Sequence, residues 1–561
     1  MSSRGCRRRL TTVATALAFG WAVSLVQAQS APAVNIGPSS QVIGKLYRIA
    51  GTLTDSVTGK AIAHAAVGLA GIAPRTDLQS VVSDDDGQFA FEPVPAGKYS
   101  LSARRRGYIR ANFDEHERYS SAIVTGEGQD TEHIPFHLDP GGEIRGRVTD
   151  DAEEPVANAQ VIVKRRSIWG GLGEHLAPVI NVTTDEKGVY ETWNLYSGKY
   201  LLGVKASPWY ALHPPMSELE SAGNQEQRAA LEALDVAYPL TYYDGTTEEG
   251  SAAPIEVGIG ETVEADFAMH AVPAVHLTVR MPSGTGQSPQ WPVVKQTMFG
   301  GELDGESVVR RTGSSETSVF EYAVAPGLYH VQGGDPPRIV EMNATGNKDV
   351  ELAAGIEAAV VTMKVQMADG SPVPKPLTIL VASPGSTERS LTAEVGDKGV
   401  VGFPAIPPGN WMLGAVNSDS DFAVVAVQIG SRIIEGDCRI ALPADPGEIT
   451  LTIVQGKTRI EGFAFKDGKG LAGVMIVLVP RNPVGNLAEF RRDQSDSDGS
   501  FALYDVIPGD YTLVAIEDGW DLDWAKPDVI GRYLPSGAAV TVRAGAPQQI
   551  QLSAPVVVQP R

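Results

Sequence analysis

Hydrophobic and polar side chains alternate in short stretches along most of this chain of 561 residues. In residues 88–92 two phenylalanines alternate with small or polar residues, and the same period restarts at residues 99–101. A period of two is typical of a strand with one buried face. Residues 84–87 (Asp-Asp-Asp-Gly) and residues 93–97, with two prolines and a glycine, have the composition of turns. The pattern predicts a turn, a strand, a second turn and a second strand.

This pattern occurs five times, at residues 83–101, 184–202, 315–331, 397–413 and 495–513. An aromatic residue follows the last turn of every copy: Tyr99, Tyr200, Tyr329, Trp411 and Tyr511. The copies recur about every 100 residues, which is the size of a small β-sandwich. Two further strands are expected before each copy, most clearly in residues 47–69, 142–163 and 459–479. Many short strands between Gly- and Pro-rich turns predict an all-β protein.

We therefore expect a tandem array of about five Greek-key β-sandwich domains, with one short helical insertion in the second. The insertion is expected as a helix over residues 217–238, with Leu219, Leu231 and Leu234 as its apolar contacts. The predicted division of the chain is a signal peptide at residues 1–28, a linker at 29–43, and sandwiches at 44–140, 141–272, 273–355, 356–455 and 456–556.

The motifs of these units carry a family resemblance. The order Gly-x-Val-x-Asp, Pro-Val-x-x-Ala-x-Val, Thr-Asp-x-x-Gly-x-Tyr/Phe and Leu-x-Pro-Gly-x-Tyr resembles the carboxypeptidase regulatory-like family. The resemblance covers residues 47–105, 142–205 and 459–516, and in looser form 358–416 and 275–332. It implies a transthyretin-like (prealbumin-type) fold, related to the Cna B-type domains of bacterial surface proteins. It also implies a multi-domain bacterial secreted protein whose modules serve stability, adhesion or binding without catalysis.

The first 28 residues have the pattern of a secretory signal. Four arginines within residues 4–9 precede a stretch of apolar or small residues at 10–26. Residues 26–28 then place small side chains at the positions that a signal peptidase reads, with cleavage expected after Ala28. No later segment has an apolar run of membrane-spanning length. We expect an exported protein that is periplasmic, cell-surface or extracellular, with no transmembrane segment after signal removal.

The net charge limits the class of binding partner, and the cysteine content limits disulfide formation. The net charge of −21 repels phosphates, so no nucleic-acid partner is expected. Of the two cysteines, Cys6 leaves with the signal and Cys438 remains, which permits no disulfide within the mature chain. A buried inert thiol is expected at Cys438 rather than a reactive one.

We searched the sequence for catalytic and metal-binding patterns. The acidic turns at Asp84 and Asp496 resemble the start of a calcium loop, but Pro95 and Ile507 stand where such a loop needs its bidentate acid. His133 and His137 lie about 13 Å apart if both lie on one strand, too far to share an ion. No nucleophile elbow or phosphate loop occurs in the sequence. We expect no catalytic residue, no metal and no cofactor, and therefore no enzyme.

The second unit differs most from the others and holds the predicted binding residues: Trp169, Trp193, Trp209 and Tyr210. Residues 164–178 are expected to form a long loop that carries Trp169. By alternation Trp193 should face outward, where it can stack on a sugar ring or anchor a protein partner. The alternative is that the helical insertion covers Trp193 or Trp209.

The function expected from these observations is a non-catalytic secreted or cell-envelope binding or scaffold protein. Its partner would be a protein or a polysaccharide of the cell envelope or the medium. One alternative is a carbohydrate-binding protein that uses exposed aromatic side chains. Another is an accessory subunit of a secreted hydrolase or transport system. The sequence does not indicate the oligomeric state.

Overall fold

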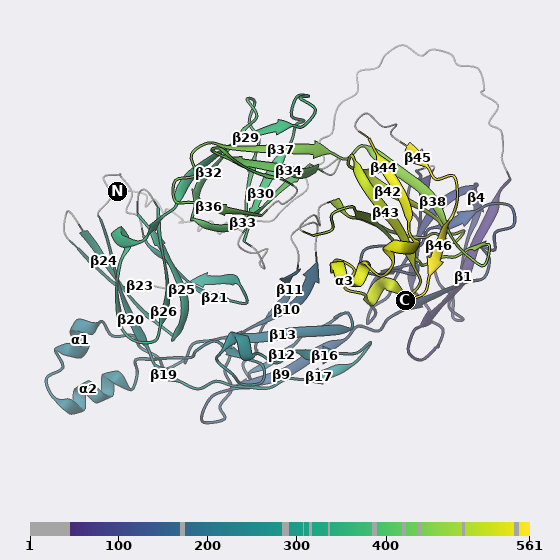
Figure 1. Cartoon of the computed structure of the whole chain (residues 1–561). Helices are drawn as coiled ribbons and strands as arrows, with labels where there is room; N and C mark the ends of the chain where they lie inside the picture. The colour runs from purple at the N-terminus through teal and green to yellow at the C-terminus, as the bar shows by residue number, and fades with distance from the viewer. Residues whose placement is uncertain are drawn as a thin grey trace, which may run out of the picture. The chain divides into compact units, whose positions relative to one another are not determined.

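The computed structural model describes residues 45–561 except 74, 169–173, 283–290, 307, 314–316, 335–336, 384–389, 418–421, 436–438, 485–488 and 544–548. The predicted signal peptide and linker, Trp169 and Cys438 lie outside the described residues. Short strands dominate, and pairs of sheets recur along the chain (Figure 1). In the described part, no helix has both the length and the apolar character needed to span a bilayer.

The first sandwich has one sheet in the order β4-β1-β8 and a second in the order β3-β2-β5-β6, with β7 also paired to β5. Its strands are β1 (Tyr47–Asp55), β2 (Ala66–Ala73), β3 (Gln79–Val82), β4 (Gln88–Val94), β5 (Gly97–Arg104), β6 (Ala111–Asn112), β7 (Ile123–Thr125) and β8 (Ile134–Leu138). Phe89 and Phe91 on β4 are buried and pack edge to face, so the alternation read from the sequence places the core correctly.

The second sandwich has the orders β11-β10-β13-β15, with β16 on β13, and β12-β9-β17, with β18 on β9. Its strands are β9 (Glu143–Thr149), β10 (Gln160–Ile168), β11 (Glu174–Thr183), β12 (Val189–Glu191), β13 (Gly198–Lys205), β15 (Thr241–Tyr242), β16 (Ile255–Val257), β17 (Thr262–Glu264) and β18 (Phe267–Ala268), and η1 (Glu249–Ser251) is a short 3₁₀ helix. A separate pair, β14 (Val236–Ala237) and β19 (Val272–Pro273), lies at its end.

Two predictions for this unit were wrong in detail. The single helix expected over 217–238 is two short helices, α1 (Met216–Glu220) and α2 (Gln225–Glu232). The break comes at Asn224, whose side chain accepts the Gln227 N–H and so starts a new helix. The expected loop at 164–178 is largely a hairpin, because β10 and β11 stay paired beyond a bulge after Val163. Three consecutive charged residues, Lys164, Arg165 and Arg166, suggested a loop, although all three lie on β10.

The third sandwich has the orders β23-β24-β20-β27 and β22-β21-β25-β26-β28. Its elements are β20 (Val275–Pro282), β21 (Val293–Met298), β22 (Gly301–Gly305), β23 (Val308–Gly313), β24 (Thr317–Val324), β25 (Gly327–Gly333), β26 (Arg338–Ala344), β27 (Lys348–Glu351), η2 (Leu352–Ala354) and β28 (Ile356–Glu357). It holds the loosest copy of the sequence pattern and yet has two complete sheets.

The fourth sandwich has the orders β32-β29-β37-β34-β35 and β31-β30-β33-β36. Its strands are β29 (Ala359–Met367), β30 (Thr378–Ala382), β31 (Ser390–Glu394), β32 (Val400–Ile406), β33 (Gly409–Val416), β34 (Phe422–Ile429), β35 (Arg432–Glu435), β36 (Arg439–Leu442) and β37 (Ile449–Gln455). In the fifth, β46 pairs with both β38 and β43 and so joins the strands into one connected sheet.

The elements of the fifth sandwich are β38 (Thr458–Lys466), β39 (Lys469–Gly470), β40 (Met475–Pro480), β41 (Arg491–Gln494), β42 (Ser500–Val506), β43 (Gly509–Ile516), η4 (Gly519–Asp521), α3 (Pro527–Ile530), η5 (Leu534–Ser536), β44 (Ala538–Val542), β45 (Gln549–Gln551) and β46 (Val556–Gln559). Every sandwich has its own buried apolar cluster. The predicted fold class, a tandem array of sandwiches with a helical insertion in the second, is confirmed. The residue boundaries of the domains stay a prediction.

The aromatic residue that marks each sequence copy has the same role five times. Each of these side chains is buried and donates a hydrogen bond to the backbone carbonyl four residues earlier. The bonds are Tyr99 to Pro95 (3.0 Å), Tyr200 to Tyr196 (2.6 Å), Tyr329 to Ala325 (2.8 Å), Trp411 to Pro407 (2.9 Å) and Tyr511 to Ile507 (2.9 Å). We call this bond the aromatic lock. It closes the turn before a core strand, so the recurring sequence phrase determines a structural turn of the sandwich.

A hydroxyl residue before the acidic turn repeats in the same way. Ser83 donates to the Ile62 carbonyl at 2.7 Å and accepts the Ala65 N–H at 2.9 Å. Thr184 in the second sandwich and Ser495 in the fifth make the matching pair of bonds. These buried hydroxyls satisfy backbone groups where the chain passes from one sheet to the other.

Candidate functional site

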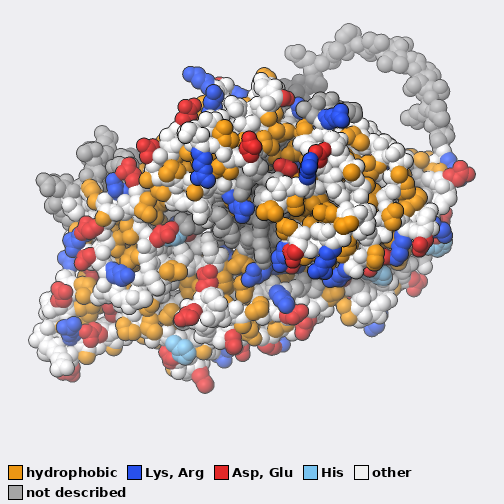
Figure 2. Space-filling model, in the orientation of Figure 1, with side chains coloured by type: hydrophobic (Ala, Val, Ile, Leu, Met, Phe, Trp, Pro, Cys, Tyr) orange, Lys and Arg blue, Asp and Glu red, His pale blue; other side chains and the backbone are white. Residues whose placement is uncertain are grey.

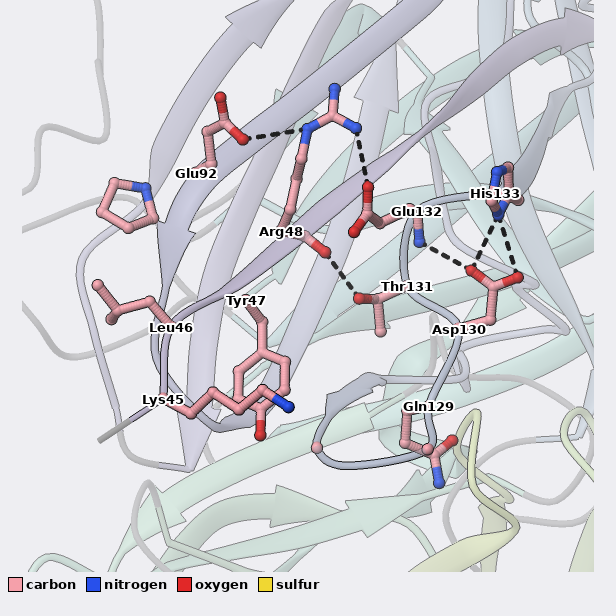
Figure 3. Close-up of a pocket in the computed structure, with 13 residues that line it drawn as sticks. Lys45, Leu46, Tyr47, Arg48, Glu92, Gln129, Asp130, Thr131, Glu132 and His133 are labelled. Atoms are coloured by element: carbon pink, nitrogen blue, oxygen red, sulfur yellow. Dashed lines mark hydrogen bonds and ion pairs between the residues drawn. The ribbon is translucent and has the colours of Figure 1, made fainter. Parts of the chain in front are cut away.

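A polar pocket opens at the start of β1 in the first sandwich (Figure 3). Its volume is about 820 Å³. It is lined by residues 45–48 at the start of β1, by Glu92 and Pro93 on β4, and by the segment 126–133 before β8. The pocket exists because this segment is tied to β1: Thr131 donates its hydroxyl to the Arg48 carbonyl at 2.7 Å.

Arg48 is the central charge of the pocket. Its guanidinium lies between two carboxylates, with Nε 3.2 Å from Glu92 Oε2 and Nη1 3.2 Å from Glu132 Oε2 (Figure 3). Beside it, the Glu132 N–H and the His133 ring hold the pKa of Asp130 below its usual range. Because these charges are already paired with one another, the pocket offers hydrogen-bonding groups and little net charge. That suits a polar, uncharged ligand group such as a hydroxyl or an amide.

The sequence did not predict this pocket. Its residues come from three segments that only the pairing of β1 with β4 and β8 brings together. The sequence carried one usable signal for the pocket. Ile49 is buried, so alternation places its neighbour Arg48 on the outer face of β1. His133 and His137 have separate partners, Asp130 and Thr54. Within the described ranges, no three His, Cys, Asp or Glu side chains are arranged to hold a metal ion.

Of the four predicted binding residues of the second sandwich, the structure describes Trp193, Trp209 and Tyr210. Trp193 is 60% exposed and lies before β13, whereas Trp209 is 82% exposed and lies after it. The two residues are thus separated in the chain by the whole of β13. Tyr210 does accompany Trp209, with ring centroids 5.7 Å apart in an edge-to-face arrangement. The helical insertion leaves both tryptophans exposed.

A group of four titratable residues joins the second sandwich to the third. His276, only 2% exposed, has Nε2 2.7 Å from Asp235 and Nδ1 3.1 Å from Glu321. His213 contacts the other oxygen of Asp235 at 3.3 Å. Burial opposes the charged form of His276, but its bonds to the two carboxylates outweigh burial and raise its pKa. Burial likewise opposes the ionised form of Asp235, and the two histidines outweigh it and lower its pKa.

The surface between these features is mixed in charge. Figure 2 shows Lys and Arg side chains interspersed with Asp and Glu over the face in view. The recurrent turns also keep acids at the surface: Asp185 accepts the N–H groups of Val189 and Lys187, which lowers its pKa. These acids stabilise their own hairpins.

The fold and its sites define a multi-domain β-sandwich protein with a polar pocket in the first sandwich and a group of titratable residues between the second and the third. Within it, residues 48–138 match the family model of the Carboxypeptidase regulatory-like domain. That match covers the first sandwich, which also holds the pocket. For the other four sandwiches the family resemblance rests on their motifs. No curated protein matches the sequence.

Three solved structures illustrate the structural similarity. The TIE protein of Bacillus anthracis is 14% identical, with 55% of this chain and 50% of that chain covered and a TM-score of 0.17. The minor pilin of Streptococcus agalactiae is 12% identical (43% and 100% covered, TM-score 0.21). The major pilin subunit of Bacillus cereus is 10% identical (73% and 99% covered, TM-score 0.14). This chain thus aligns with about half of the first of these proteins. We infer no shared function from these similarities.

Proposed function

We propose that this protein is a non-catalytic, exported scaffold that holds binding surfaces at fixed spacing on a set of five β-sandwiches. The observation that carries the proposal is that two consecutive pairs of sandwiches, the second with the third and the fourth with the fifth, share buried contacts. A freely jointed string would serve flexible tethering instead, because its linkers would make few contacts.

The junction of the second and third sandwiches has an apolar cluster of its own. Ile162, Leu240 and Tyr242 of the second sandwich pack with Met298 and Phe299 of the third. Polar contacts surround this cluster. Lys205 pairs with Glu306 at 2.7 Å, and Glu249 accepts the Phe299 N–H at 2.6 Å. A junction with apolar packing and buried polar bonds resists bending more than polar contacts alone.

The fourth and fifth sandwiches share core residues. Ala423 on β34 of the fourth sandwich is buried within the apolar cluster of the fifth, and Val425 and Val454 pack against the same cluster. The connection between β37 and β38 is only residues 456–457. A short connection with shared packing supports a fixed angle between the two units.

Limited proteolysis of the full-length protein under native conditions tests the scaffold proposal. We expect the first cuts in exposed loops, and protection of residues 271–274 and 455–458 at the two junctions. Early cleavage at both junctions would contradict a fixed scaffold. Fractionation of the tagged protein tests export separately, and recovery from the cytoplasm alone would refute it.

Carbohydrate binding is a second candidate function, because Trp209 is almost fully exposed and carries Tyr210 beside it. An indole face in water is a platform on which a sugar ring can stack. We predict that Trp209→Ala lowers retention of the protein on an insoluble polysaccharide at least tenfold. Trp291→Ala is the matched control, since Trp291 is also exposed but lies in the third sandwich. Equal retention of both variants and the wild type would exclude this site. An accessory role beside a secreted hydrolase or transport system stays a prediction.

A further inference from the structure

The first and fifth sandwiches contact each other through a segment of each. The segment of residues 112–125 in the first sandwich lies against residues 492–500 in the fifth. One backbone bond joins the two segments, from Ser497 N–H to the Ala122 carbonyl at 3.0 Å, and Val124 N–H donates to the Ser497 side-chain Oγ at 2.9 Å. Ala122 N–H donates to Asp496 Oδ1 at 2.9 Å. We call this contact the clasp.

Asp496 occupies the turn position of Asp84 and Asp185, but its carboxylate makes different hydrogen bonds. In the first and second sandwiches the matching acids, Asp84 and Asp185, accept N–H groups of their own turns. Asp496 instead accepts Ala122 N–H with one oxygen, and with the other it accepts the Lys98 ammonium at 2.6 Å. The turn itself is capped by Asp498, which accepts the Ser500 N–H. A copy of the turn has thus become a binding element for another sandwich.

Buried polar side chains extend the clasp. Gln494, which is 1% exposed, donates to Asp114 Oδ2 at 3.1 Å and to Ser121 Oγ at 2.9 Å, and its oxygen lies 3.1 Å from His116 Nδ1. Ser121, also 1% exposed, donates to the Ser495 carbonyl at 2.9 Å. Because a buried amide must find partners, Gln494 fits this particular loop better than a generic surface.

An aromatic and charged cluster completes the contact. The Arg492 guanidinium binds both oxygens of Glu117, with Nη1 3.0 Å from Oε1 and Nη2 2.5 Å from Oε2. The same guanidinium lies over the Trp524 ring of its own sandwich, 4.1 Å from the centroid. Trp520 contacts two rings of the first sandwich, His116 at 5.2 Å and Tyr119 at 5.6 Å between centroids. The fifth sandwich thus recognises an acidic and aromatic loop through charge, stacking and backbone bonds together.

We propose that the clasp is a separable docking interface, and that a second copy of this chain can supply its first sandwich in trans. The two halves lie at opposite ends of the described chain, with Glu117 and Arg492 375 positions apart. In the described part, no sheet contains strands of both sandwiches. The halves are held by hydrogen bonds, by ion pairs and by the contact of Trp520 with the His116 and Tyr119 rings, so the groups exposed when they part are mostly polar. The two surfaces differ, so exchange between two copies produces a reciprocal dimer or a longer chain.

A charge-swap experiment on the full-length protein tests this. Glu117→Arg and Arg492→Glu each place like charges across the clasp, so either variant alone should be a monomer with an open clasp. A 1:1 mixture restores an Arg–Glu pair only between different molecules. We expect the mixture to sediment at twice the monomer mass or more. The double variant, which restores the pair within one chain, should remain a monomer with the wild-type sedimentation coefficient.

A second pair of variants tests the clasp without changing Arg492. It is needed because Arg492→Glu also removes the packing of Arg492 on Trp524 and so can disturb folding. Lys98→Glu and Asp496→Lys reverse the other ion pair of the clasp. Their 1:1 mixture should likewise associate, and raising the salt from 0.1 M to 1 M should weaken that association. If both mixtures stay monomeric while their components keep the wild-type far-ultraviolet circular dichroism, the interface does not form in trans and the proposal is wrong. Single variants with the sedimentation of the wild type would also overturn it, since the clasp would then not depend on these charges.

Discussion

At the scale of single residues, the aromatic lock explains why one sequence phrase recurs five times. The ring of each aromatic residue belongs to a sandwich core, while its hydroxyl or indole N–H satisfies a carbonyl that the preceding turn leaves free. An apolar ring alone would serve the core but would leave the carbonyl without this donor. Tryptophan replaces tyrosine in the fourth sandwich, and its indole N–H makes the same bond.

We predict that Tyr511→Phe destabilises the fifth sandwich by about 1 kcal/mol, because the Ile507 carbonyl loses its buried donor. A midpoint shift in thermal unfolding of the full-length protein would measure the loss. Tyr504→Phe is the matched control in the same sandwich, since Tyr504 is half exposed. Equal midpoints for the two variants would mean that the lock adds nothing beyond the ring.

At the scale of elements, the sequence predicted the strands better than the connections between them. Alternation locates β4, β5 and their equivalents because one face of each is buried in a core. The hairpin of β10 and β11 was missed, since its charged side chains suggested a loop and strand pairing is not visible in one strand's sequence. The helix was placed correctly but overextended, because the cap at Asn224 competes with continued helix. The pocket and the clasp depend on contacts between distant segments, which local patterns do not predict; for the pocket they signal only that Arg48 faces outward.

Strand β41 also holds an acid with an unusual environment. Burial raises the pKa of Asp493 to about 7, with its neighbour Asp496 acting in the same direction and the Ala502 N–H and Lys98 opposing. Since the folded-state pKa lies above the unfolded value of 3.8, the native state keeps a proton that the unfolded state has lost, and stability falls as pH rises from about 4 to about 7 and then levels off.

We predict that Asp493→Asn removes this pH dependence. Between pH 5 and pH 8 the unfolding midpoint of the fifth sandwich should fall by about 10 °C or more in the wild type, since the two pH units between 5 and the pKa of about 7 correspond to about 2.7 kcal/mol. It should change much less in the variant, which keeps an oxygen for the Ala502 N–H and cannot ionise. Asp510→Asn is the control, since Asp510 lies on β43 of the same sandwich and is exposed. A wild-type midpoint that does not fall over this range would contradict the assignment.

At the scale of the whole molecule, the junctions decide whether five similar sandwiches behave as one object. The junction of the second and third sandwiches places an ionisable group at its centre, because His276 lies between Asp235 and Glu321 while His213 contacts Asp235 from outside. Protonated His276 holds both carboxylates, one from the helical insertion and one from β24. Loss of that proton leaves two acids facing a neutral ring in a buried site, which is costly.

The signs of the pKa shifts set a pH window for this junction. The raised pKa of His276 gives stability that is complete below about pH 6.5 and is lost as pH rises through the folded-state value. The lowered pKa of Asp235 gives stability that is present above about pH 4 and is lost as pH falls through its folded-state value. We therefore expect the second and third sandwiches to be held together most firmly between about pH 4 and pH 6.5.

His276→Gln should abolish the upper edge of this window. At pH 5.5 we expect it to destabilise the joined pair by about 3 kcal/mol, because Asp235 and Glu321 lose their shared cation. As pH rises through the raised folded-state pKa of His276, the difference from the wild type should shrink, since above that pKa His276 is neutral in both the folded and the unfolded state. Differential scanning calorimetry of the full-length protein across pH measures this, with His270→Gln as the control at an exposed ion pair with Asp151. A deficit for His276→Gln that is constant from pH 5.5 to pH 8 would show that the imidazole stabilises the junction by packing and hydrogen bonding alone, without its charge.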